Sequence, residues 1–463
     1  MPSMRTGDTE RRGEGVKKYE VGVSQGGSLG GQEGYDGQRI KEETRMITIP
    51  EGAALDQALI DPVTWADEAR IHAYLTWLRA NDPVRYMTPE GYEPFYAITK
   101  HADVMAIERD KQGFINDPRP TLAPTMVTEA IAALTGRKHL VRSLVQMDDP
   151  DHMKYRMLTA AWFTRQRLQS MKATVDALAD QYVSRLAEFG GRCDFVKDLA
   201  VWYPLRVVMS ILGVPEEDEP IMLKLTQELF GSTDPDVQRS FDLMSIGQVV
   251  EDFEAYFKGI SEDRRKNPRD DVASIIANAQ IDGAPIGDLE AAGYYIIVAT
   301  AGHDTTSSST AGGLLALLEN PGEFDKLRAD PDRHLAGAVD EMIRWVSPVR
   351  HFMRTATVDT PLRDKVIKAG ESVILWYPSA NRDEEVFEAP FEFRVERPAA
   401  RNLAFGYGAH VCLGQHLARM EMEALYRALL ERVEHIELDG TPQYAQAAFV
   451  GGLKSLPIRY RLK

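Results

Sequence analysis

The chain has 463 residues, of which 44% are hydrophobic and 27% are charged, and its formal net charge is −16. This composition is that of a globular protein long enough for one large core or two domains. The negative charge argues against general binding to nucleic acid or to an anionic membrane. With only two cysteines, Cys193 and Cys412, a disulfide scaffold is excluded, and we expect a reducing, cytoplasmic location.

The first 45 residues differ in composition from the rest of the chain. They are rich in glycine and charge and show almost no apolar periodicity, so we expect residues 1–45 to be a disordered tail or a mis-assigned start, with Met46 as an alternative initiator. Residues 46–463 are expected to form a single domain. The most apolar run, residues 291–301, is too short to cross a bilayer, so we expect no membrane span.

Within this domain, long helical patterns predominate. The patterns predict helices over residues 165–189, 243–267 and 288–320, with short strands near both ends of the chain, at 92–98, 373–377 and 458–461. Residues 387–404 contain Pro and Arg without a clear period, which predicts an ordered, meandering loop. The fold class is therefore mainly α-helical with small β-sheets (α+β).

Two pairs of charged or basic residues are spaced to share a helix face. His152 and Arg156 are four residues apart, and Glu341 and Arg344 are three apart. Spacing alone is equally compatible with surface side chains and a surface salt bridge.

A polar run interrupts the predicted helix 288–320. The segment Ala301-Gly302-His303-Asp304-Thr305-Thr306 lies midway along it, where Gly302 costs about 1 kcal/mol relative to Ala. One interpretation is a kink with a threonine hydroxyl bonded to the preceding turn. The other is a groove in which an acid and an alcohol, Asp304 and Thr305, handle dioxygen and protons.

The stretch 405–414, FGYGAHVCLG, places one cysteine among three glycines just before a helical pattern. A cysteine at a helix N-terminus, behind a glycine-rich turn, is readily held as a thiolate. The pattern F-G-x-G-x-H-x-C-x-G resembles the cysteine-ligand loop of the cytochrome P-450 superfamily, in which a thiolate is an axial ligand of haem iron. The run A-G-x-D-T-T in the central helix and E-x-x-R at residues 341–344 resemble two further motifs of this superfamily.

From about residue 50 onwards the chain resembles the soluble, ferredoxin-dependent bacterial members throughout. Among these it is most similar to the α-terpineol-hydroxylating subfamily, notably over residues 299–309 and 379–387. The resemblance implies a haem-thiolate monooxygenase with haem b (iron protoporphyrin IX) between the long central helix and the cysteine loop. It would hydroxylate a small hydrophobic substrate, with a cyclic monoterpene or its alcohol as first choice and an aromatic or polycyclic hydrocarbon as the alternative.

The resemblance also implies roles for individual residues. Cys412 is the expected iron ligand, and Thr305 and Asp304 are expected to manage oxygen and protons. The residues expected to hold the haem propionates are His152, Arg156, Arg354 and His410. Glu341, Arg344 and Arg397 are expected to form a buried cluster that locks the proximal face. The distal pocket is expected to include Ile297, Thr300, Ala301, Phe352, Phe449 and Val450, a mainly apolar set suited to binding by packing.

No flavin motif or iron–sulfur cysteine motif occurs in the chain, so electrons are expected from separate proteins. The resemblance implies a 2Fe-2S ferredoxin and an NAD(P)H-dependent ferredoxin reductase. Because a ferredoxin is acidic, basic residues near the cysteine face are expected to bind it, with Lys154, Arg165 and Arg419 as candidates. The protein itself is expected to be a monomer. Two alternatives are a peroxide-driven haem-thiolate enzyme, in which the acid–alcohol pair is typically lost, and a non-catalytic haem sensor.

Overall fold

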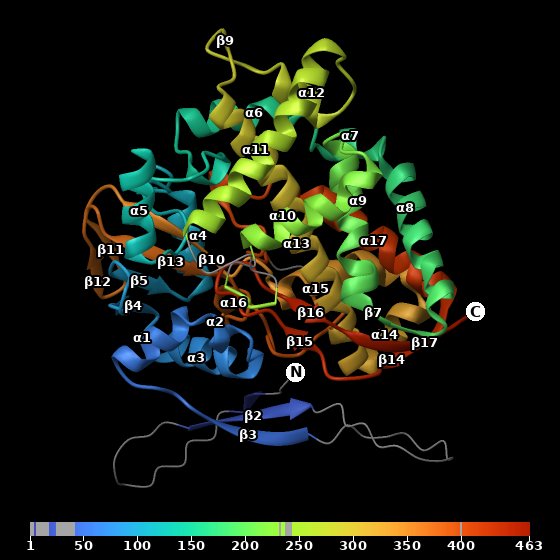
Figure 1. The fold of residues 1–463 in the computed structure, drawn as a ribbon. Coiled ribbons are helices and arrows are strands. Elements are labelled where there is room, and N and C mark those ends of the chain that lie inside the picture. The colour runs from blue at the N-terminus through green and yellow to red at the C-terminus, as the bar shows by residue number, and fades with distance from the viewer. Residues whose placement is uncertain (1–3, 6–17, 25–41, 231–232, 237–242, 399–400) are drawn as a thin grey trace, which may run out of the picture.

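The computed structural model describes residues 4–5, 18–24, 42–230, 233–236, 243–398 and 401–463. A long helix, α13 (Asp288–Glu319), runs through the middle of the molecule, with helices packed around it and a sheet to one side (Figure 1). In the first half of the chain the helices are α1 (Ala53–Ile60), α2 (Pro62–Trp65), α3 (Glu68–Asn81), α4 (His101–Arg109), α5 (Thr125–Thr135), α6 (Asp151–Ala160), α7 (Arg165–Gln169), α8 (Lys172–Ser184), α9 (Trp202–Ile211) and α10 (Glu219–Phe230). The later helices are α11 (Leu243–Lys266), α12 (Val272–Ala277), α14 (Pro321–Ala329), α15 (Pro331–Val346), α16 (Tyr377–Ala380) and α17 (Gln415–Arg432).

The strands form small sheets at the edges of the helical body. The largest sheet has the order β4-β5-β13-β10-β6, in which β13 runs parallel to β5 and the other pairs are antiparallel. Its strands are β4 (Val84–Met87), β5 (Phe95–Ile98), β6 (Phe114–Ile115), β10 (His351–Ala356) and β13 (Ser372–Trp376). The other strands are β1 (Met4–Arg5), β2 (Lys18–Ser24), β3 (Glu42–Thr48), β7 (Arg192–Asp194), β8 (Gln280–Ile281), β9 (Ala284–Pro285), β11 (Thr360–Leu362), β12 (Lys365–Ile367), β14 (Val433–Leu438), β15 (Gln443–Tyr444), β16 (Leu453–Ser455) and β17 (Pro457–Leu462).

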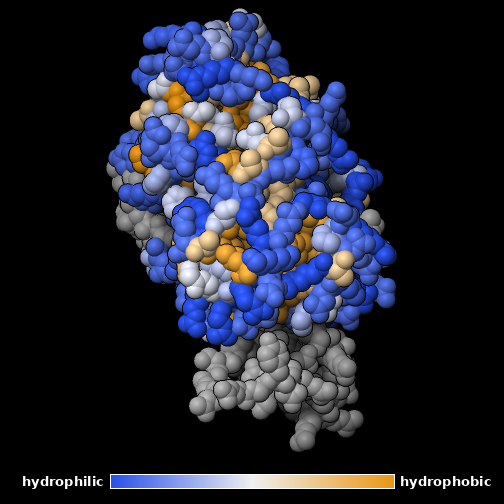
Figure 2. Space-filling model, turned by 90° about the vertical axis from the view of Figure 1, so that its right-hand side faces the viewer, coloured by the Kyte–Doolittle hydropathy of each residue, from blue (hydrophilic) through white to orange (hydrophobic). Residues whose placement is uncertain are grey.

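The core is divided between the helical body and the sheet. The largest apolar cluster surrounds α13 and includes residues of α8, α9, α15 and α17, while two smaller clusters lie on the two sides of the large sheet. The helix α13 approaches α9 closely at Gly302, where an added Cβ would lie 2.8 Å from a methyl carbon of Val208. Close packing of the two helices therefore favours glycine at position 302, because a larger residue would push them apart. The face drawn in Figure 2 is mostly hydrophilic, with apolar residues showing between hydrophilic ones.

The structure agrees with two of the three predicted helices to within one residue, at α11 and α13. The predicted helix over 165–189 is instead divided into α7, α8 and a 3₁₀ turn at Arg185–Phe189. The hydroxyl of Ser170 donates to the carbonyl of Arg167, at 2.7 Å, and so helps to end α7. The described residues between 387 and 404 contain no helix or strand, as predicted for a meander.

The N-terminal segment is not wholly without regular structure. Strands β2 and β3 pair in antiparallel register, with Tyr19 opposite Ile47 and Glu20 opposite Met46, within a segment for which the sequence predicts a disordered tail or a mis-assigned start up to residue 45. The alternation of Tyr19, Val21 and Val23 suits a strand, and Ile47 is buried in the core. Residues 1–3, 6–17 and 25–41 lie outside the described residues, and the domain boundary at residue 46 stays a prediction. No helix within the described parts of the chain has the length and apolarity required to cross a membrane.

Candidate functional site

The loop that carries Cys412 is shaped by two glycines with left-handed backbone. Gly406 and Gly408 have φ of 68° and 69°, which glycine adopts without a steric penalty. At Gly408 an added Cβ would lie 2.1 Å from the carbonyl oxygen of Glu108, so the loop lies directly against α4. The backbone N–H of Cys412 donates to the carbonyl of Phe405, at 2.8 Å, and α17 begins three residues later. The loop thus holds a half-buried thiol before a helix N-terminus.

Several groups shift the pKa of this thiol in opposite directions, and the net effect raises it. Burial raises the pKa of Cys412, while backbone N–H groups of Gly414 and Gln415 and the cations Arg156 and Arg419 lower it. The protein alone therefore does not make the thiolate as readily as the sequence pattern suggests. A bound haem iron would supply the missing positive charge, and Cys412 would hold it as a thiolate.

One stripe of α13 is open although most of this helix is buried. Ile297, Ala301, Asp304, Thr305 and Ser308 are partly exposed and recur three or four residues apart, so they share one face. An open face in the middle of an otherwise buried helix is the face that a bound planar group or substrate would cover. Thr300, which was expected in the pocket, is 1% exposed and its hydroxyl donates to the carbonyl of Ile296, at 2.7 Å.

The acid and the alcohol of this stripe do not bond to each other. The hydroxyl of Thr305 donates to the carbonyl of Ala301, at 2.7 Å, which is the bond to the preceding turn that the first interpretation of this segment expects. A hydroxyl that donates in this way keeps its lone pairs available as acceptors. The Oδ2 atom of Asp304 is buried and has no hydrogen-bond partner among the described residues. The bond of Thr305 to the preceding turn is therefore present, and the role of Asp304 and Thr305 in handling dioxygen and protons stays a prediction.

His303 precedes Asp304 on α13 and is completely buried. Its Nε2 lies 2.9 Å from the carbonyl of Val201, and its Nδ1 lies 3.2 Å from the hydroxyl of Thr226. The ring therefore ties α13 to the segment before α9 and to α10. Its Nδ1 also lies 3.3 Å from Oδ1 of Asp304, so the buried ring contacts the acid of the open stripe as well.

Three of the four residues expected at the haem propionates come together. His152 and His410 stack with ring centroids 3.8 Å apart, and both line a small cavity with Arg354 and Lys111. Burial lowers the pKa of His152 to about 4 and that of His410 to about 2, so both rings are neutral at pH 7. Both ring nitrogens of His152 are buried without a hydrogen-bond partner in the described structure.

The fourth residue, Arg156, does not line this cavity. Its guanidinium donates to the carbonyl of Val411, at 2.6 Å, beside Cys412. It therefore supports the cysteine loop in this structure. The orphaned nitrogens of His152 and the guanidinium of Arg354 fit a carboxylate ligand such as a haem propionate.

A buried glutamate in the same cavity escaped the sequence analysis. Glu108 is 5% exposed and lines the cavity beside Arg354 and His410. The available signal was its position four residues after Val104 and next to Ile107, two apolar residues of α4 that are buried. A glutamate on a short helix is normally assigned to solvent, so this signal was weak.

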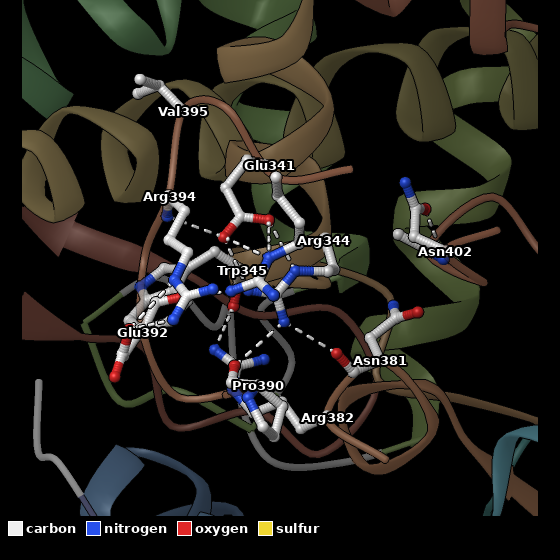
Figure 3. Close-up of polar contacts among 12 residues, drawn as sticks. Glu341, Arg344, Trp345, Asn381, Arg382, Pro390, Glu392, Arg394, Val395 and Asn402 are labelled. Atoms are coloured by element: carbon white, nitrogen blue, oxygen red, sulfur yellow. Dashed lines mark hydrogen bonds and ion pairs between the residues drawn. The ribbon is translucent and has the colours of Figure 1, made fainter. Parts of the chain in front are cut away.

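The predicted Glu–Arg–Arg cluster is assembled in the structure. Arg344 donates to Glu341 through Nε and Nη2, at 2.7 and 2.8 Å, and through Nη1 to the carbonyls of Asn381 and Pro390 (Figure 3). Arg397 donates from Nε to both oxygens of Glu341, at 3.0 and 2.9 Å. The cluster thereby fastens α15 to the meander that leads to the Cys412 loop.

The apolar residues expected to hold the substrate come from several segments. The rings of Phe352 on β10 and Phe449 pack edge to face with centroids 5.5 Å apart. Val450 is bridged to Val349, which precedes the same strand. Ile297 and Ala301 lie on the open stripe of α13. Part of the predicted lining thus forms a cluster of side chains from two distant parts of the sequence.

The three basic residues expected to bind a redox partner differ in their surroundings. Lys154 pairs with Asp282 at 2.5 Å, and Arg419 pairs with Asp340 at 2.8 Å. Arg165 is exposed and has no ion-pair partner among the described residues. Burial and then the charge of Arg165 lower the pKa of His416, in the first turn of α17, so Arg165 lies close to the helix that follows Cys412.

The sequence profile of the family "Cytochrome P450" matches residues 126–460, which contain α13, the Glu341 cluster and the Cys412 loop. The chain belongs to the cytochrome P450 family. This P450 is 43% identical to Cytochrome P450-terp of a Pseudomonas species, over 89% of this chain and 98% of that protein. It is 32% identical to a steroid C26-monooxygenase of Mycolicibacterium smegmatis, over 90% and 97% of the two chains. The crystal structure of CYP108D1 from Novosphingobium aromaticivorans superposes with a TM-score of 0.83, at 43% identity over 90% and 99% of the two chains.

As a member of this family the P450 is a monooxygenase that binds haem b, and its fold is the P450 fold, as predicted. The thiol of Cys412, the orphaned nitrogens of His152 and the open stripe of α13 are consistent with that cofactor. The residue assignments within the site stay predictions.

Proposed function

We propose that this P450 hydroxylates a small hydrophobic molecule, with a cyclic monoterpene or its alcohol as first choice and an aromatic or polycyclic hydrocarbon as the alternative. The observation that carries the proposal is the apolar set Ile297, Ala301, Phe352 and Phe449, of which the first two share a helix face with Asp304 and Thr305. The identity to Cytochrome P450-terp over nearly its full length supports the choice of a terpene. Bound haem would supply the iron at which O2 is activated.

The protein side chains have separate tasks in this proposal. The phenyl rings hold the substrate by packing and exclude water. Thr305, whose hydroxyl donates to the carbonyl of Ala301, would accept a hydrogen bond beside the place where oxygen reacts, and Asp304, with one unpartnered oxygen, would pass protons inwards. His152, Arg354 and His410 would hold the propionates, and Cys412 would bind the iron. Arg156 would support the cysteine loop from its bond to Val411.

Electrons would come from a separate 2Fe-2S ferredoxin that is reduced by an NAD(P)H-dependent reductase. The exposed guanidinium of Arg165 near the start of α17 supports docking of an acidic protein on this face. Arg419 and Lys154 are already paired with carboxylates, so a partner would have to compete for them.

The test is a titration of the purified ferric holoprotein with monoterpenes, monoterpene alcohols and aromatic hydrocarbons, followed by the haem absorption band. We expect a large spectral shift with α-terpineol-like compounds and a weaker one with arenes. A spectral shift with arenes alone would favour the alternative substrate class, an aromatic or polycyclic hydrocarbon. Absence of a haem band from the purified protein would refute the whole proposal.

Turnover then separates the monooxygenase from a peroxide-driven enzyme or a haem sensor. We expect NADH-dependent product formation with a surrogate ferredoxin and reductase, and little product with hydrogen peroxide. Replacing Thr305 with Val should lower the product formed per NADH several-fold, because the hydroxyl is lost. Thr310→Val, which removes a buried hydroxyl without a described partner on the same helix, is the matched control.

A further inference from the structure

Glu108 is a buried acid in a cavity built for a carboxylate. Its Oε1 accepts a hydrogen bond from the hydroxyl of Tyr377, at 2.7 Å, and lies 3.5 Å from Nη2 of Arg354. Its Oε2 is buried and has no hydrogen-bond partner among the described residues. The same cavity is lined by His152, Arg354 and His410, which are expected to hold the haem propionates.

An acidic residue at this place creates an electrostatic conflict. A propionate is itself a carboxylate, and two carboxylates that share a site cannot both ionise at neutral pH. Burial raises the pKa of Glu108 to about 7, although Arg354, Tyr377 and the backbone of Tyr407 lower it. One proton shared between the two acids removes the conflict and turns the repulsion into a charge-assisted hydrogen bond.

We propose that Glu108 is a positioning residue for the haem: its protonated carboxyl donates a hydrogen bond to a propionate in the cavity formed with His152, Arg354 and His410. The inference depends on the assignment of this cavity to the propionates. Nothing in the P450 assignment itself names Glu108, which comes from α4 and lies outside the segment that matches the family profile.

The pH dependence follows from the groups that face Glu108. These are Lys111 just after α4, Asp148 and Asp149 just before α6, His152 on α6, Arg354 on β10, Tyr377 on α16, and Tyr407 and His410 in the cysteine loop. Below about pH 7 Glu108 is neutral and donates to the propionate. Above that pH it ionises, repels the propionate and competes for Arg354. Haem retention is therefore highest below pH 7 and falls as the pH rises.

The experiment measures the rate of haem transfer from the ferric holoprotein to excess apomyoglobin at about pH 6 and about pH 8.5. We expect wild type to release haem about five-fold or more faster at the higher pH. In Glu108→Gln the amide is neutral at both pH values and can still donate, so its two rates should be nearly equal. Glu431→Gln, which neutralises an exposed glutamate on α17, should keep the wild-type pH dependence.

Two results would overturn the proposal. One is a release rate of wild type that does not change with pH. The other is a Glu108→Gln variant that keeps the wild-type pH dependence or releases haem faster by the same factor at both pH values, as expected for a purely structural ion pair with Arg354.

The pH dependence of the haem midpoint potential is a second readout. It should fall with rising pH around pH 7 in wild type and stay flat in the variant, because reduction favours the protonated acid.

The failure of this proposal is distinguishable from failure of the proposed function. A holoprotein with a normal haem band but no terpene-induced shift would refute the proposed substrate and would not affect the proposal for Glu108. A preparation with no haem band would refute the haem site, and with it the inference.

Discussion

At the scale of single residues, two buried glutamates are satisfied in different ways. Glu341 accepts from the guanidinium groups of Arg344 and Arg397, so its charge is neutralised within the protein. Glu108 has one tyrosine donor and a distant arginine, and it needs a proton or a ligand. The sequence predicted the first, because Glu341 and Arg344 belong to one motif. It could not predict the second, because the partners of Glu108 come from β10 and α16, more than 240 residues away.

The Glu341 cluster yields a stability prediction. Glu341→Gln should destabilise the protein by about 3–5 kcal/mol, because it leaves two guanidinium groups buried without a counter-charge. The variant should also purify with little haem, since the cluster fastens the meander before the Cys412 loop. Urea unfolding and the haem band per protein measure both effects.

The neighbouring residue offers a matched control. Asp340→Asn removes only the pair with Arg419, in which the aspartate side chain is 52% exposed, and should cost less than about 1 kcal/mol. Equal losses of stability and haem in the two variants would contradict a special role for the buried cluster.

At the scale of elements, strand β10 joins the two segments that border the expected substrate pocket. Nε2 of His351 accepts from the backbone N–H of Leu122, at 3.1 Å, and Nδ1 lies 3.0 Å from the carbonyl of Ala448. Only the neutral ring with its proton on Nδ1 can make both bonds. The loop before α5 and the segment before β16 are thus held to the sheet by one imidazole.

The two hydrogen bonds of the His351 ring, here called the His351 clasp, predict that acid lowers the stability of the fold. Burial lowers the pKa of His351 to about 3, well below its unfolded value. The unfolded chain therefore binds the proton first as the pH falls, so the clasp contributes fully above about pH 6.5 and is lost towards pH 3. Between about pH 7.5 and pH 5 the loss from this one residue is about 2 kcal/mol.

Urea unfolding at these two pH values, followed by tryptophan fluorescence, measures the effect. His351→Gln should be less stable than wild type at the higher pH and should lose about 2 kcal/mol less on acidification. His435→Gln, at a largely exposed position on β14, should behave as wild type does. An unchanged acid response in His351→Gln would show that the clasp does not titrate as argued.

Elements also show where prediction from sequence ends. The helices α11 and α13 were predicted because their periodic patterns are long and free of proline. The break between α7 and α8 was missed, since a local Ser170 hydroxyl bond changes no hydrophobic period. The strand β2 was missed because its short alternating run lies in a glycine-rich, charged segment. The break comes from a local contact and the strand from pairing with β3, and neither is visible in the composition or period of the segment.

At the scale of the whole molecule, net charge and local charge act in opposite directions. The chain carries −16 in total, which repels an acidic ferredoxin at long range. Arg165, exposed on α7 near the start of α17, would provide local attraction for such a partner. Docking should therefore depend on a few cations and weaken as salt screens them.

The corresponding test reverses one charge. Arg165→Glu should lower the second-order rate of reduction by a reduced 2Fe-2S ferredoxin about ten-fold at low ionic strength, with the difference shrinking as salt is added. Substrate-induced spectral shifts should stay as in wild type, because the residue lies on the protein surface. Lys258→Glu, an identical charge reversal at an exposed site on α11, controls for net charge. If both variants slow reduction equally, overall repulsion governs the encounter and Arg165 has no specific part. If only Arg165→Glu does so, the electron enters on the side of α7 and α17, where Cys412 immediately precedes the helix.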